Sequence, residues 1–141
     1  MAVALVLVTA FAPAAGARSP ADALIDRVNA IRADQGLRPL KPSSSLLRSS
    51  QRFSGWLMGH DLFQHRSTVS VEGGFSRSAE AIAMHYTRRA RIGATVRGWL
   101  ASSTHRSLLL DRAVTLIGVG VTRGDFAGRG ATIWVLQTAR R

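Results

Sequence analysis

Cysteine is absent from the 141-residue chain. The protein therefore has neither disulfide bonds nor thiolate metal sites, and its folded domain must be stable through packing alone. Apolar runs long enough to cross a membrane are also missing, because Val3–Phe11 is far shorter than the roughly 20 residues that such a helix needs. The length leaves room for one domain.

Residues 1–17 have the features of a secretory signal peptide. The apolar run Val3–Phe11 is followed by Pro13 and then by Ala15-Gly16-Ala17, a small-residue pattern of the kind that signal peptidase accepts. No Lys or Arg precedes the run, so only the terminal amine supplies positive charge there. The alternative is a buried N-terminal strand or helix. We favour export, with residues 18–141 as the mature domain in the periplasm or outside the cell.

Acidic residues are few: 8 Asp and Glu stand against 19 Lys and Arg, for a formal net charge of +11. Lysine occurs once, at Lys41, and every other basic residue is arginine, whose planar guanidinium binds phosphate or carboxylate at two points. We therefore expect an anionic envelope lipid or glycan as partner, with contact to a membrane surface possible. The alternative is an ordinary solvated surface, on which arginine is frequent only because a GC-rich genome favours arginine codons.

Nucleic acid is not an expected partner, because the basic residues do not alternate with aromatic ones as they would along a nucleic-acid groove. The chain is expected to be a monomer. It contains neither a Gly-x-Ser-x-Gly elbow nor a His-Glu-x-x-His zinc motif. Gly118-Val119-Gly120 lacks the third glycine of a dinucleotide loop, and its position inside a strand predicts instead that a helix approaches the sheet closely there.

The order of the expected elements is typical of an α+β fold, with helices first and an antiparallel hairpin last. Ser19 is the expected N-cap of the first helix, and Gly36 its stop. Residues 59–78 are rich in Gly, Ser and charge and are expected to be irregular. The remaining expected elements are a second helix over 43–59, a third over about 88–101, and strands over 116–123 and 131–138.

Two histidines and one carboxylate stand out as candidate site residues. Glu80 lies among small and apolar residues, where a carboxylate must find a partner or stay protonated. His65 and His105 lie in separate segments on either side of it. A single histidine is more often a surface residue or a hydrogen-bonded core residue, so each signal is weak alone. His60 and His85 have no comparable context and are expected to be peripheral.

Several segments together resemble bacterial members of the CAP superfamily, which groups cysteine-rich secretory proteins, antigen 5 and plant pathogenesis-related proteins. The order and spacing of all of them carry the resemblance, which spans residues 24 to about 137. The segments are Leu24–Arg32 with Gly36–Leu40, Phe63-Gln64-His65, Ala79-Glu80-Ala81-Ile82-Ala83, Trp99 with Ser102–Arg106, Ile117–Val121 and Trp134–Gln137.

The resemblance implies an α–β–α sandwich around a small antiparallel sheet. It also implies a cleft where two histidines and one or two acids meet, sometimes with a divalent metal such as zinc. On this chain the cleft residues would be His65, Glu80, His105 and Gln137, with His65 and His105 as the metal ligands. Nothing in the sequence itself requires a cofactor.

This chain departs from the family pattern around the expected site. The second acid of the family has no counterpart here, and Ala79, Ala81 and Thr104 replace the usual Gly, Asn and Gly. These departures bear on catalytic chemistry more than on the fold.

Three functions are compatible with these features. The first, which we favour, is a binding module of the cell envelope that engages a lipid, glycan or divalent metal through the cleft. The second is a metal-dependent hydrolase, in which His65 and His105 hold a metal-bound water and Glu80 is the base. The third is a purely electrostatic role on an anionic lipid or polysaccharide, which needs no cleft.

Overall fold

The computed structural model describes residues 16, 18–66 and 74–141. The predicted signal peptide lies outside the described residues except for Gly16, so the export prediction remains a prediction. Eight elements follow one another: α1 (Pro20–Asp34), β1 (Lys41–Pro42), α2 (Ser44–Gly59), β2 (Arg77–His85), α3 (Ile92–Ala101), α4 (Ser103–Leu109), β3 (Leu116–Phe126) and β4 (Arg129–Arg140).

The sheet has four strands in the order β1-β3-β4-β2. β3 and β4 form the predicted antiparallel hairpin, and its turn residues Ala127 and Gly128 both have positive φ, as tight hairpin turns require. β2 pairs antiparallel with β4, whereas the two-residue β1 is parallel to β3. The long C-terminal strand is therefore internal, and β1 and β2 are the edges.

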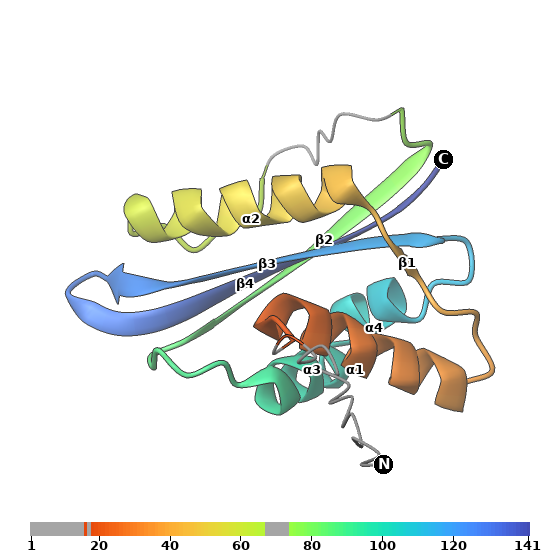
Figure 1. Ribbon diagram of the computed structural model, residues 1–141, viewed down its shortest axis with the longest axis horizontal. Helices are drawn as coiled ribbons and strands as arrows, with labels where there is room; N and C mark the ends of the chain where they lie inside the picture. The colour runs from red at the N-terminus through yellow and green to blue at the C-terminus, as the bar shows by residue number, and fades with distance from the viewer. Residues whose placement is uncertain (1–15, 17, 67–73) are drawn as a thin grey trace, which may run out of the picture.

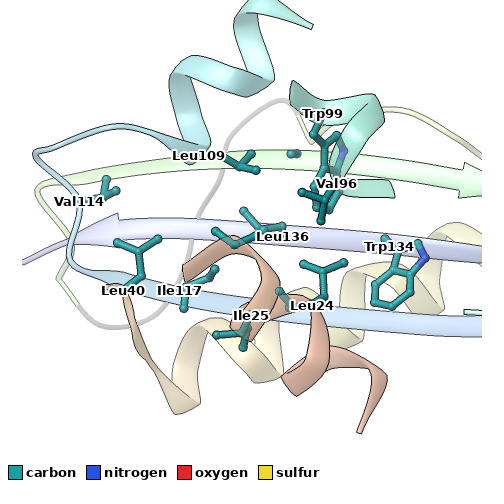
Figure 2. Close-up of a cluster of buried hydrophobic side chains, with 13 residues drawn as sticks. Leu24, Ile25, Leu40, Val96, Trp99, Leu109, Val114, Ile117, Trp134 and Leu136 are labelled. Carbon is teal, nitrogen blue, oxygen red and sulfur yellow. The ribbon is translucent and has the colours of Figure 1, made fainter. Parts of the chain in front are cut away.

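Helices cover both faces of the sheet, with α2 on one face and α1, α3 and α4 on the other (Figure 1). The expected α–β–α sandwich is confirmed. Figure 2 shows Leu24 of α1 and Trp99 of α3 directed at the sheet, in one buried cluster with Trp134 and Leu136 of β4. A second cluster, which includes Phe53, fills the space under α2.

Two glycines of β3 allow α2 to lie close to the sheet. A Cβ at Gly118 would come within 2.2 Å of the Leu46 backbone, and one at Gly120 within 2.2 Å of the Ser50 backbone. Real Cβ atoms do not make such contacts, so only glycine fits. The prediction that these glycines admit a helix is confirmed.

The predicted start and stop of the first helix are confirmed, whereas the third helix differs from its predicted bounds. The Ser19 hydroxyl accepts a hydrogen bond from the Asp22 N–H at 3.1 Å, and Gly36 takes a left-handed φ of +66° just after α1. The third helix begins at Ile92, four residues later than the expected start at Arg88. Strand β2 and helix α4 were not expected from the residue pattern, and β2 begins inside the segment expected to be irregular.

Candidate functional site

Glu80 lies on the edge strand β2 and faces α2. It is directly opposite Gln137 on β4, which is in turn opposite Gly118 on β3. Residues directly opposite one another across strands share a face of the sheet, and the missing Cβ of Gly118 points at α2. The Glu80 side chain is only 2% exposed, so its carboxylate needs partners inside the protein.

Both oxygens of the Glu80 carboxylate have a polar neighbour. Gln137 donates a hydrogen bond from Nε2 to Oε2 at 2.9 Å. The Nδ1 atom of His65 lies 3.4 Å from Oε1, and the Nε atom of Arg66 lies 4.0 Å from Oε2. The structure thus places His65 and Gln137 on either side of the Glu80 carboxylate. His65 itself is about half exposed, so the carboxylate lies beneath an imidazole that reaches solvent.

His105 reaches the same place from the opposite layer. It lies in α4, which begins at a Ser102 cap and packs against β2. Because β2 is an edge strand, side chains from the two helical layers can meet beside it, and the rings of His65 and His105 have centroids 6.2 Å apart. Burial lowers the pKa of His105, and the neighbouring His65 lowers it further.

Arg66 is part of the site and was missed in the sequence. Its guanidinium lies over the Phe53 ring at 4.0 Å, and its Nη2 donates to the Ser49 carbonyl oxygen at 3.2 Å. Burial lowers the pKa of Arg66, and the Glu80 carboxylate opposes that change. The only signal for Arg66 in the sequence is its position next to His65, and a basic residue is unremarkable in so basic a chain.

Gln137 has one buried oxygen that accepts no hydrogen bond from the described residues. While its Nε2 donates to Glu80, its Oε1 is buried and has no hydrogen-bond partner among the described residues. If the Gln137 amide were turned over, its Oε1 atom would face the Glu80 carboxylate, and two acceptor oxygens would meet. The carboxylate therefore fixes the orientation in which Nε2 donates. A buried acceptor without a donor is costly, so this atom is a point of strain beside the Glu80 carboxylate.

The other two histidines lie elsewhere, as expected. His60 stacks on Trp56 with ring centroids 4.4 Å apart and makes a 2.8 Å hydrogen bond to its carbonyl oxygen. His85 lies at the far end of β2, where its Nε2 is 2.8 Å from the Thr95 hydroxyl. Burial lowers the pKa of His85, and the nearby positive charge of Arg91 lowers it further. Neither residue contacts the Glu80 carboxylate.

The arrangement offers two imidazoles to a ligand above one buried carboxylate. Within residues 16, 18–66 and 74–141, no group of three or more His, Cys, Asp or Glu side chains is placed to hold a metal ion. The described part of the chain also has no helix long and apolar enough to cross a membrane.

Comparison with solved structures shows the same fold in proteins of several bacteria. An extracellular protein of Bacillus anthracis that contains an SCP domain is similar with a TM-score of 0.71 at 24% identity, over 86% of this chain and 40% of that one. An outer surface protein of Borrelia burgdorferi has a TM-score of 0.68 at 16% identity, over 85% of this chain and 91% of that one.

A cysteine-rich secretory protein of Staphylococcus aureus gives a TM-score of 0.65 at 18% identity, over 92% of this chain. This chain spans 40% of the length of the Bacillus and Staphylococcus proteins. A search of curated proteins found no match. The sequence model of the CAP cysteine-rich secretory protein family matches residues 25–138, which include His65, Glu80, His105 and Gln137. The chain therefore belongs to the CAP, or cysteine-rich secretory protein, family.

Proposed function

We propose that this protein is an exported binding protein of the cell envelope, and that His65 and His105 bind a divalent cation such as zinc. The observation that carries the proposal is the buried Glu80 carboxylate 3.4 Å behind Nδ1 of the half-exposed His65. A carboxylate that accepts from one ring nitrogen fixes the tautomer and leaves the other nitrogen for a metal. A lipid or glycan ligand at the same place is the alternative that the sequence also predicts.

The spacing of the two rings is compatible with a shared ion. Zinc binds imidazole nitrogen at about 2.0–2.1 Å in tetrahedral sites, which puts the centroids of two ligating rings roughly 5 Å apart. The observed 6.2 Å would need a small rotation of the exposed His65 ring. Two imidazoles leave the remaining positions to water or to an anionic ligand.

The contacts of Glu80 favour binding over hydrolysis. A general base needs an oxygen within reach of the water that it activates. Here one oxygen accepts from Gln137 at 2.9 Å, with Arg66 nearby, and the other faces His65. Glu80 is better placed to orient His65 than to take a proton from a metal-bound water.

Zinc titration by calorimetry at neutral pH tests the proposal. We expect His65→Ala and His105→Ala each to lower zinc affinity by more than about tenfold, since each removes a ligand. Glu80→Gln should lower it by roughly 10-fold or more while circular dichroism shows an unchanged fold, because an amide orients His65 less well than a carboxylate.

His60→Ala is the matched control, since it removes an imidazole that stacks on Trp56 and hydrogen-bonds to its carbonyl oxygen, away from Glu80. It should leave zinc affinity unchanged. Absence of zinc-dependent heat in the wild-type protein, or an equal loss in the His60 variant, would contradict the proposal. Unfolding of the Glu80→Gln variant without any zinc effect in the histidine variants would make the cluster structural.

A further inference from the structure

A cavity of about 400 Å³ lies at the β1 edge of the sheet, the edge opposite to Glu80. It forms where the segment that follows α1 meets the first residues of β3. Four cationic residues line it: Arg32, Arg38, Lys41 and Arg112. None of the described residues that line it is acidic.

Arg32 forms the buried wall of this cavity, with the residue only 1% exposed. Its guanidinium donates to three backbone carbonyls, from Nε to Arg38 at 3.0 Å and from Nη1 to Leu109 at 2.7 Å and Asp111 at 3.0 Å. These partners satisfy hydrogen bonds, and the Leu109 carbonyl at the C-terminal end of α4 adds the partial negative charge of a helix terminus. None of the three carries a full negative charge. The Asp111 carboxylate is itself bound by Arg77 at 2.8 Å.

The charge of Arg32 is thus held inside the protein without a carboxylate in direct contact. Burial lowers the pKa of Arg32, and the more distant Asp111 charge only partly opposes this. Its Nη2 nitrogen donates no hydrogen bond to any described residue. A buried cation of this kind is stabilised by an anion that approaches from the cavity.

The other three cations are exposed and also unpaired. Arg38, Lys41 and Arg112 form no ion pair with any residue in the described ranges, as is true of most basic residues of this chain, so what distinguishes them is their position around one cavity. The exposed Thr115 side chain adds a hydroxyl to the cavity wall. Four like charges around one cavity repel one another, and a doubly charged anion relieves more of that repulsion than a singly charged one.

We propose that this cavity binds a phosphate group. Guanidinium groups match the tetrahedral oxygens of phosphate with paired N–H donors, and lysine adds a point charge. The phosphate could belong to a phosphomonoester headgroup of a lipid or be free in solution, and both present the same oxygens. The site is separate from the imidazole pair, so it does not depend on the proposed metal binding.

Calorimetric titration with inorganic phosphate at physiological ionic strength tests this inference. The double variant Arg38→Ala/Arg112→Ala should bind phosphate more than about tenfold more weakly than the wild-type protein. The control Arg48→Ala/Arg123→Ala removes the same charge from exposed residues that do not line the cavity, and it should change affinity by less than about twofold. Acetate at matched ionic strength should compete poorly.

Vesicles distinguish the two sources of phosphate. If the source is a lipid, phosphatidylcholine vesicles doped with phosphatidate should bind the wild-type protein but not the cavity variant, Arg38→Ala/Arg112→Ala. Added inorganic phosphate should then release the wild-type protein from the vesicles. If the source is free phosphate, vesicle binding should be equal in the cavity variant and the control. Absence of phosphate binding, or an equal loss in both double variants, would overturn the inference.

Discussion

His105 lies where burial and a second imidazole both oppose its protonation. Its pKa should therefore be below the usual value of about 6.5. An NMR titration that follows the His105 ring protons should find its midpoint below that pH. His65→Ala removes the smaller of the two causes, so it should raise the midpoint part of the way. A His105 midpoint at or above 6.5 in the wild-type protein would contradict this prediction.

The same shift couples stability to pH. The unfolded chain takes up the His105 proton at about pH 6.5, whereas the folded protein does so only at lower pH. The contribution of His105 is therefore complete above about pH 6.5 and declines as the pH falls through the folded-state pKa. Urea denaturation at pH 7.5 and 5.5 should show a smaller loss of stability on acidification in His105→Ala than in the wild-type protein.

Single residues of the site differ in how far the sequence alone could identify them. Glu80 was recognisable because a carboxylate among apolar residues is unusual, and the family resemblance then selected His65 and His105 among four histidines. Arg66 was not recognisable, because its role follows from the packing of its guanidinium on Phe53 and its distance to Glu80. Such contacts arise between elements and leave no pattern along the chain.

At the scale of elements, α2 lies so close to β3 that two positions of the strand have no room for a side chain. Gly118→Ala would place a methyl group 2.2 Å from the Leu46 backbone, which cannot move aside as a flexible side chain could. We expect a loss of about 2–3 kcal/mol or more in the free energy of unfolding, measured by urea denaturation.

Gly98→Ala in α3 is the matched control, since a Cβ there meets no atom within 4 Å. It should be neutral or stabilise the protein by up to roughly 1 kcal/mol, because alanine favours a helix. If both variants had the same stability, the close approach of α2 to the sheet would be incorrect.

Elements with a clear period were predictable, and those shaped by tertiary contacts were not. The first two helices have apolar residues at helical spacing, the first also has a side-chain cap at Ser19, and the final hairpin has alternation around a turn. Strand β2 lacks this signal because Glu80 and Ile82 both face α2 while small alanines face the other layer. It is held as a strand by pairing with β4 and by the Trp99 indole, which donates to the Ile82 carbonyl oxygen at 3.1 Å.

For the whole molecule, export remains the first prediction to test. Protein recovered from the envelope or the medium should begin at Arg18, within a few residues, when its N-terminus is sequenced, because Ala15-Gly16-Ala17 is the expected cleavage site. A protein that stays in the cytoplasm and retains Met1 would contradict it.

The internal position of β4 sets an order in time for the formation of this protein. β2 and β3 do not pair with each other, and each depends on β4 for most of its hydrogen bonds. Until residues 129–140 have left the ribosome or a translocation channel, the sheet cannot close and Glu80 has no Gln137 to hold it. We therefore expect the core and the Glu80 site beside it to form only after β4 is free to pair with both of its neighbours.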